Sequence, residues 1–260
     1  MTHDDTLSTT GSPSEGRSSV EPLAAQVISV LCEQQTTNAA GVRLFALDYL
    51  VRTVLSRGGF DAVLVLDELR GYRLTPDAII DLYIPQAALR LGDMWLSSDI
   101  DFAEVTVGAL RLQALLGEAS NGLIWIGQAS KSTLHALVVV PEGEQHFLGS
   151  SVVAAQLRRS GCDVSLAICE TQKQIVARVV QNKPDMVLLS CARLAGLKPI
   201  IAIVKKIRAS VDHAPVLALG GPLRGNAAGI KEQAGVDLVT SIPADVVKFC
   251  AKRKEALGPK

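Results

Sequence analysis

The sequence predicts an all-helical N-terminal segment followed by a parallel α/β domain. Between Pro22 and about Glu118, apolar residues recur every three or four positions, which is the period of an amphipathic helix. After residue 134, short apolar runs alternate with helix-length stretches. The two patterns meet in a stretch rich in Ser, Asn and Gly. We therefore expect a disordered tail at 1–20, a helical bundle at 21–120, a linker at 121–132 and an α/β domain at 133–257.

The composition excludes several classes of protein. The 260 residues include 26 Lys and Arg and 26 Asp and Glu, so the formal net charge is zero and direct binding to nucleic acid is not expected. The apolar runs are far shorter than the roughly 20 residues of a membrane helix, so no membrane association is expected. The N-terminus lacks the basic and apolar regions of a secretory signal, which predicts a cytoplasmic location.

Two apolar stripes and two breaks define the helical half. Arg57-Gly58-Gly59 ends one helix, and Thr75 is a predicted N-cap because Pro76 follows at the first helical position. The stripes consist of Leu44, Leu47, Val51, Val54 and Leu55, and of Ala78, Ile79, Leu82 and Ala87.

Five apolar runs are the strand candidates of the second half. Runs of this kind alternating with helices indicate a parallel sheet covered on both faces. Ligand sites of such sheets lie beyond the carboxyl ends of the strands, where the strand order switches. The candidates are 135–140, 163–167, 185–190, 216–219 and 236–239.

Polar residues and glycines stand at the ends of three candidate strands. Glu144 and His146 follow the first, at a spacing that lets the carboxylate accept one imidazole N–H while the other nitrogen faces a ligand. A histidine on a polar loop is also a common surface residue, and glycines are common in loops. The further candidates are Gly149, where a helix begins, Ser190 after the third run, and Gly220 and Gly221 after the fourth.

Together these residues resemble the pattern of a cobalamin-binding domain. That pattern is Asp-x-His-x-x-Gly, then Ser-x-Leu, then Gly-Gly, and this sequence has Glu144-x-His146-x-x-Gly149, Ser190 and Gly220-Gly221 at similar spacing. The segments Tyr83-Ile84-Pro85, Leu91 to Trp95 and Asp101 to Glu104 are similar to the helical cap that precedes this domain in corrinoid proteins. The resemblance implies a flavodoxin-like, five-stranded parallel sheet of the Rossmann-like B12-binding type, preceded by an all-helical cap bundle.

The resemblance also implies roles for individual residues. His146 would be the metal ligand, replacing the lower ligand of cobalt, and Ser190 would hydrogen-bond the nucleotide tail of the cofactor. Gly220 and Gly221 would leave room for that tail. Trp95 on the cap would cover the upper face of the corrin, although an ordinary packing role is the alternative.

The sequence departs from the pattern at three places. Glu144 replaces Asp, and Ala192 replaces the Leu of Ser-x-Leu. Light-sensing B12 regulators carry a Glu-His pair in the cap, but here Glu104 is followed by Val105 and Thr106. Glu104 remains a candidate cofactor-facing residue, while the usual upper-ligand histidine is missing.

A free-standing cap and cobalamin domain resembles the AerR/PpaA-type antirepressors of photosynthesis genes. The resemblance implies a light-responsive regulator, not an enzyme, that binds adenosyl- or hydroxocobalamin and contacts a transcriptional repressor. Three alternatives stay open: a corrinoid shuttle protein of a methyltransferase system, a heme-binding sensor in which His146 ligates iron, and a scaffold without cofactor.

Other chemistry-bearing residues receive structural interpretations. The five cysteines have no metal-binding spacing and are expected to be small buried hydrophobic residues. Arg158 and Arg159, which the sequence places beside the site, are expected on a solvated helix face, as are Lys205, Lys206 and Arg208.

Overall fold

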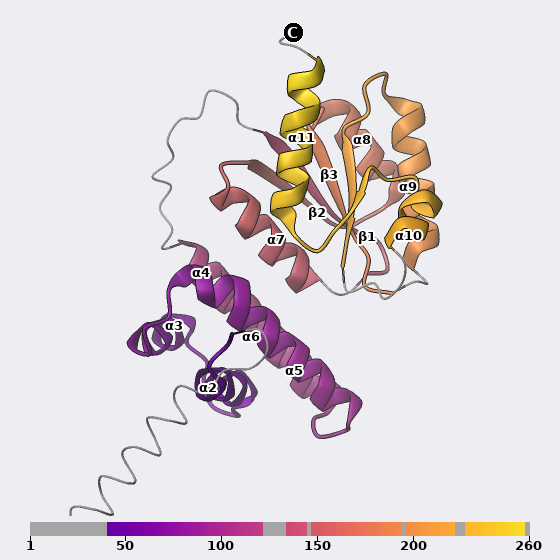
Figure 1. The fold of residues 1–260 in the computed structure, drawn as a ribbon. Helices are drawn as coiled ribbons and strands as arrows, with labels where there is room; N and C mark the ends of the chain where they lie inside the picture. Colours follow the sequence, from indigo (N-terminus) through magenta and orange to yellow (C-terminus); the bar gives the residue numbers. More distant parts are fainter. Residues whose placement is uncertain (1–40, 122–133, 145–146, 194–195, 222–226, 258–260) are drawn as a thin grey trace, which may run out of the picture. The chain divides into compact units, whose positions relative to one another are not determined.

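The computed structural model describes residues 41–121, 134–144, 147–193, 196–221 and 227–257 (Figure 1). The chain divides into two compact units, Met1–Tyr49 and Leu50–Lys260. The predicted tail and nearly all of the predicted linker lie outside the described residues. Helix α2 (Leu44–Leu55) begins in the first unit and ends in the second.

Helices α3 to α6, which we call the helical segment, precede the sheet. Thr75 caps α4 as predicted, because its Oγ1 accepts a hydrogen bond from the Ala78 N–H at 3.1 Å. Helices α5 and α6 pack closely, since a Cβ added at Gly108 would lie 2.8 Å from Leu91 Cδ1. None of the described helices has the length and apolar content needed to cross a membrane. The elements are α3 (Ala62–Gly71), α4 (Pro76–Ala78), the π-helix η1 (Ile79–Tyr83), α5 (Ile84–Leu96) and α6 (Phe102–Asn121).

The π-helix changes which residues of the predicted second stripe are buried. Leu82 was expected in the core, but 39% of its surface is exposed, while Tyr83 and Ile84 are buried. A π-turn closes an i→i+5 hydrogen bond, so it contains more residues per turn than an α-helix and rotates the following residues around the axis. The prediction for Leu82 was therefore wrong because it assumed an uninterrupted period of 3.6.

The second half forms a five-stranded parallel sheet in the order β2-β1-β3-β4-β5, which confirms the predicted fold class. Each strand overlaps the apolar run that predicted it. Strand β1 lies between β2 and β3, so the chain leaves it in one direction and returns on its other side. The strands are β1 (His135–Pro141), β2 (Asp163–Glu170), β3 (Met186–Ser190), β4 (Val216–Gly220) and β5 (Leu238–Val239).

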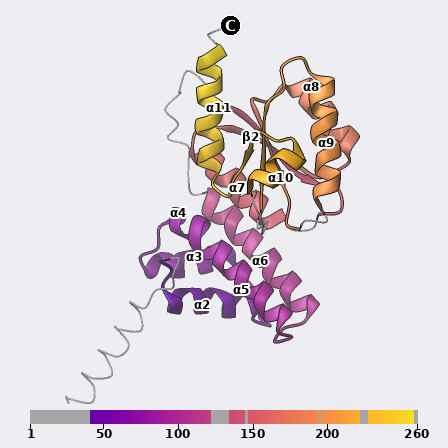
Figure 2. The ribbon, with the colours of Figure 1, turned by 45° about the vertical axis from the view of Figure 1, so that its right-hand side comes forward.

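Helices cover both faces of this sheet (Figures 1 and 2). Leu137 and Val139 of β1 point into a core that they share with α8 (Gln172–Asn182), α9 (Leu197–Ser210) and α10 (Ala227–Ala234). The alternate residues Ala136 and Val138 point into a second core. Helices α7 (Phe147–Arg159) and α11 (Pro243–Leu257) complete that core. This alternation follows from the two-residue period of a strand and explains why the strand runs are apolar throughout.

Candidate functional site

The loop after β1 is joined to the loop after β3 at the carboxyl edge of the sheet. Gly143 has a φ of +86°, and the Glu144 N–H donates to the Pro141 carbonyl at 3.1 Å, which closes a tight turn. The Glu144 Oε2 atom then accepts a hydrogen bond from the Ala192 N–H at 3.2 Å. The strand order switches between the adjacent strands β1 and β3. The carboxyl edge at such a switch point is the usual place for a ligand in an open parallel sheet.

Glu144 was predicted to support the imidazole of His146. His146 lies outside the described residues, so this contact and its role as metal ligand stay predictions. The structure shows a partner that the sequence did not reveal, because the Ala192 N–H belongs to a loop 48 positions away. Among the described residues there is no group of three or more His, Cys, Asp or Glu side chains placed to hold a metal ion.

Ser190 and Gly220 end the adjacent strands β3 and β4, and Gly221 directly follows β4. Ser190 pairs with Gly220 in the parallel register, and the Cys191 N–H donates to the Gly220 carbonyl at 2.9 Å. Gly221 has a φ of +130°, and a Cβ added there would lie 2.1 Å from the Cys191 carbonyl oxygen. Glycine at 221 is therefore required by the protein backbone itself.

Gly149 and Ser150 lie in the first turn of α7, the helix that follows β1 and its loop. A Cβ added at Gly149 would meet no atom within 4 Å, so space is open beside the helix backbone. Ser150 is only 4% exposed, yet its Oγ atom has no hydrogen-bond partner within the described part of the chain. Ser150 was not among the site residues predicted from sequence. The available signal was a hydroxyl on the apolar stripe that Ala154 and Leu157 continue.

Trp95 and Glu104 lie in the helical segment. Trp95 is 47% exposed near the end of α5, with its ring centroid 6.5 Å from that of Phe102. The Glu104 carboxylate accepts a hydrogen bond from the Asp101 N–H at 3.0 Å, while the Glu104 N–H donates to the Asp101 carboxylate at 2.8 Å. This reciprocal pair is a capping box at the start of α6. A contact of either residue with a cofactor stays a prediction.

Cys162, Cys191 and Cys250 are buried as expected, Cys169 is not, and Cys32 lies outside the described residues. Cys191 is 1% exposed beside the site, and its thiol donates to the Arg193 carbonyl at 3.1 Å. Burial raises the pKa of the Cys191 thiol, the hydrogen bond to Arg193 opposes that rise and the nearby charge of Glu144 adds to it. Cys169 is exposed, contrary to expectation. It lies between Ile168, which pairs with Val140, and Glu170, which pairs with Pro141, so it is the extra residue at a register shift.

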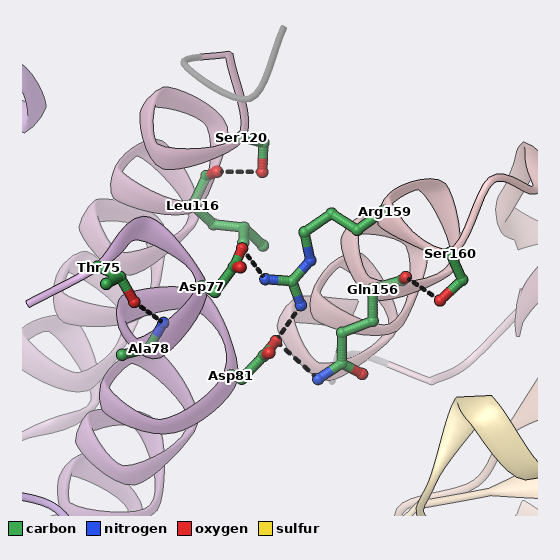
Figure 3. A network of polar contacts seen from close by, with 9 residues as sticks. All are labelled: Thr75, Asp77, Ala78, Asp81, Leu116, Ser120, Gln156, Arg159 and Ser160. Atoms are coloured by element: carbon green, nitrogen blue, oxygen red, sulfur yellow. Dashed lines mark hydrogen bonds and ion pairs between the residues drawn. The ribbon is translucent and has the colours of Figure 1, made fainter. Parts of the chain in front are cut away.

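Arg159 was expected on a solvated face, and this prediction was wrong. The Arg159 side chain is 20% exposed, and its guanidinium forms ion pairs with Asp77 at the start of α4 and with Asp81 in η1 (Figure 3). Gln156, one turn earlier on α7, donates to the same Asp81 carboxylate at 2.9 Å. Burial lowers the pKa of Arg159, but the hydrogen bonds to Asp81 and Asp77 outweigh it and raise the pKa above its ordinary value. The sequence also placed Arg159 beside the site, whereas it ends α7, at the far end from Gly149.

Comparison with known proteins gives the class of this fold and site. Residues 134–246 match the family described as B12 binding domain, a range that contains all five strands and the loops that follow them. The chain is also 31% identical over 181 residues to the "Uncharacterized 20.5 kDa protein in bchF-crtJ intergenic region" of Rhodobacter capsulatus. That match covers 68% of this chain and 93% of the relative. The chain therefore belongs to the family of this Rhodobacter capsulatus protein, and it carries a B12 binding domain.

Two solved structures resemble the chain at low sequence identity. The monomethylamine corrinoid protein of Methanosarcina barkeri has a TM-score of 0.64 and 13% identity, covering 82% of this chain and 100% of that one. A cobalamin-binding protein from Desulfitobacterium hafniense has a TM-score of 0.42 and 19% identity, covering 79% and 97%. The first of these shows that the fold is shared with a known structure.

The described residues at this edge offer a helix N-terminus and a hydroxyl without a partner within the described part of the chain. Open space adjoins Gly149, and a buried hydroxyl without a partner lies next to it at Ser150. The N-terminus of a helix favours an anionic group such as a phosphate, and α7 begins at this edge. Glu144 and Gly221 hold the neighbouring loops close to the ends of β3 and β4. The edge thus provides a fixed backbone frame together with a hydrogen-bond donor that the protein leaves unused.

Proposed function

We propose that this protein binds cobalamin at the carboxyl edge of its sheet and acts as a light-responsive transcriptional regulator. It works by contact with a repressor protein and is not itself an enzyme. The observation that carries the first part is the convergence of Glu144, Ser190, Gly220 and Gly221 at the switch point of a sheet that matches the B12 binding domain. Four residues from three separate loops and strand ends meet there.

Each residue has a role in this proposal. His146 would ligate the cobalt of bound cobalamin, and Glu144 fixes the end of the loop after β1 by accepting the Ala192 N–H. Ser190 would hydrogen-bond the nucleotide tail. Gly220 and Gly221, which have no side chains, would leave room for that tail at the end of β4. Adenosylcobalamin, when bound, would supply a cobalt–carbon bond that light can break.

The regulatory part rests on the relative and on the architecture. The Rhodobacter capsulatus relative is encoded between bchF and crtJ, in a photosynthesis gene cluster region. This location favours an antirepressor of photosynthesis genes, of the AerR/PpaA type, over a methyl carrier. The likeness to the Methanosarcina barkeri corrinoid protein concerns the fold alone and does not favour a shuttle function.

Helix α7 offers a physical route from the site to the helical segment. Its 13 residues span about 20 Å, starting at Phe147 beside the site loop and ending at Arg159. Arg159 is held by carboxylates of α4 and η1. A shift of the site loop on cofactor binding or photolysis would displace α7 as a rigid body and change these ion pairs. The helical segment would then present a different surface to the repressor.

The cofactor is tested by absorbance spectroscopy of the purified chain with hydroxocobalamin and with adenosylcobalamin. We expect the wild type to retain both, and His146→Ala to lose the spectrum of histidine-ligated cobalt. His135→Ala is the matched control, because His135 is an exposed histidine at the opposite end of β1, paired with Asp163. A wild-type protein that retains neither corrinoid contradicts the proposal, and a Soret band after incubation with heme would support the heme sensor instead.

The regulatory role needs a second measurement. We expect the affinity of the adenosylcobalamin complex for the repressor to change on illumination, while the hydroxocobalamin complex shows no such change. Equal affinities in light and dark contradict a light-responsive regulator. Methyl transfer through the bound corrinoid, in the presence of methyltransferase partners, would identify a shuttle protein.

A further inference from the structure

Strand β2 keeps a strained residue at its carboxyl end. Its register with β1 is regular as far as Ile168, which pairs with Val140, and then shifts, so that Glu170 pairs with Pro141. Cys169 is the extra residue, and its φ of +55° lies in the left-handed region that non-glycine residues rarely adopt. Such strain persists where the surrounding contacts fix the backbone, and it is concentrated at functional sites. The bulge brings Glu170 opposite Pro141, the last residue of β1.

The main chain of Glu170 fastens the loop that follows β1. Its carbonyl accepts a hydrogen bond from the Glu142 N–H at 3.1 Å. Glu144 makes two further hydrogen bonds, from its N–H to the Pro141 carbonyl and from the Ala192 N–H to its carboxylate. Of these three bonds, the one from Glu142 ties the loop to β2. The predicted metal ligand, His146, belongs to the same stretch between β1 and α7.

Helix α8 fixes the side chain of Glu170. The Nε atom of Arg178 lies 2.7 and 2.9 Å from the two carboxylate oxygens of Glu170, and the Nη2 atom lies 2.6 Å from Oε1. Charge-assisted contacts of this two-pronged kind are among the strongest hydrogen bonds in proteins, and only 15% of the Glu170 side chain is exposed to competing water. Helix α8 is a firm support, because Thr171 forms a capping box at its start and Ile175 and Val179 lie in the core.

We propose that Glu170 is a positioning residue for the loop after β1, through which Arg178 and helix α8 set the place of the residues that lead to His146. This inference rests on the proposed cobalamin binding, because it concerns the loop that carries the predicted ligand. A histidine ligates a metal well only when its ring is correctly oriented, and residues outside the ligand set provide that orientation. Glu170 acts through Glu142 and is not itself a ligand.

The first test compares Arg178→Gln with Arg208→Gln in the full unliganded chain. Arg208 is a matched control, because it also pairs with a carboxylate, that of Asp237, which lies just before β5. The exposed fractions of the two arginine side chains are similar, 42% for Arg178 and 38% for Arg208. Hydrogen–deuterium exchange is measured by mass spectrometry of the peptides that cover 141–149. We expect exchange there to become faster in Arg178→Gln and to keep the wild-type rate in Arg208→Gln.

The second test measures binding of hydroxocobalamin by absorbance. In Arg178→Gln the Kd should rise about 3- to 10-fold, and a smaller fraction of the bound cobalamin should show the spectrum of histidine-ligated cobalt. Glu170→Gln should have the same effects. The double variant should bind no more weakly than the weaker single variant, because each substitution breaks the same pair. Arg208→Gln should match wild type in Kd and in spectrum.

Different failures have different meanings. Wild-type exchange of the loop in Arg178→Gln would show that the ion pair only stabilises the fold, which overturns the inference. Faster exchange with an unchanged Kd and spectrum also overturns it, because the anchor would then not govern the ligand. Additive effects of Arg178→Gln and Glu170→Gln would show that the two residues do not act as a pair. If the wild type does not retain hydroxocobalamin, the proposed function itself fails, and that result is recognised before any variant is compared.

Discussion

The Nη2 atom of Arg159 donates to the carboxylate of Asp81 across 78 positions of sequence. Asp81 lies in the π-helix η1 and also accepts a hydrogen bond from Gln156. One carboxylate therefore receives two donors from α7, and Asp77 holds the other arm of the guanidinium. This arrangement ties the helix that starts at the site to the helical segment, and it leads to two of the predictions below.

Loss of the Arg159 ion pairs should destabilise the protein. Arg159→Gln leaves the part-buried Asp81 with fewer donors, and we expect the free energy of unfolding to fall by about 1–2 kcal/mol. Asp77→Asn should cost less than about 0.5 kcal/mol, because the Asp77 side chain is 61% exposed and water screens its pair. Urea unfolding followed by circular dichroism measures both. Equal losses of unfolding free energy in the two variants would show that the pair with Asp81 stabilises the protein no more than the pair with Asp77.

The same substitution should uncouple the site from the surface that meets the repressor. In Arg159→Gln we expect the affinity for adenosylcobalamin to stay within about twofold of wild type, while the light-dependent change in repressor affinity decreases. Arg208→Gln is the control, since Arg208 also pairs with a carboxylate but binds Asp237 and the Gly235 carbonyl within the α/β domain. A full light response in Arg159→Gln would rule out this route.

Gly149 and Gly221 should respond oppositely to alanine. In Gly221→Ala the new Cβ would overlap the Cys191 carbonyl at a φ of +130°, so we expect a loss of more than about 3 kcal/mol or failure to fold. Gly149→Ala meets no protein atom and removes a glycine from a helix, so stability should be unchanged or rise by up to about 1 kcal/mol. Cobalamin affinity of Gly149→Ala should fall more than about tenfold, because the methyl group occupies the open edge. Thermal melts and cobalamin titration measure these effects, and undiminished affinity would place the ligand elsewhere.

Two substitutions of Glu104 separate its capping role from a role toward cofactor. Glu104→Ala should cost about 0.5–1 kcal/mol through loss of the capping box with Asp101, whereas Glu104→Gln should keep it, since glutamine also caps. We expect cobalamin affinity to follow stability in both. A Glu104→Gln protein of normal stability with weakened cobalamin binding would instead show that the carboxylate faces the cofactor.

Stability should decrease in alkaline solution because of Cys250. Burial, with a further contribution from the charge of Asp185, raises the pKa of the Cys250 thiol to about 11 from an ordinary 9.0. The folded protein keeps this proton over a range in which the unfolded chain loses it. The contribution is therefore fully present below pH 9 and is lost as the pH rises from 9 to 11. Unfolding in reducing buffer at pH 8 and 10.5 measures the decrease, which should be smaller in Cys250→Ala and unchanged in Cys169→Ala, whose thiol is exposed.

Strands β1, β3 and β4 were predictable from sequence because they are buried on both faces. A run such as 186–189 has no polar residue, so its apolar character alone marks it. The chain order of helices and strands then limits the sheet to few topologies. The start of α4 was predictable for a similar local reason, since Thr75 and Pro76 act within one turn.

Other features depend on contacts that no local pattern contains. Leu82 was misplaced because one wide turn shifts the helical period, and nothing in the composition of η1 marks it. The partners of Arg159 and of the Glu144 carboxylate lie 78 and 48 positions away. Ser150 looked like an ordinary helix residue until its burial was known. The candidate site was thus found by spacing, while its hydrogen bonds required the fold.

The π-helix also constrains which deletions the protein sequence can tolerate. An α-helix becomes a π-turn by the insertion of one residue, so deletion of one residue within Ile79–Tyr83 would restore a regular helix. Such a deletion turns everything on one side of it by about 100° relative to the other side. Asp77 and Asp81 would stay on one side of the helix, because residues three or four positions apart share a face, but the residues of α5 would turn relative to them. Homologues that are one residue shorter here should therefore bury a different set of α5 positions from the Ile84, Ala87 and Leu91 set of this chain.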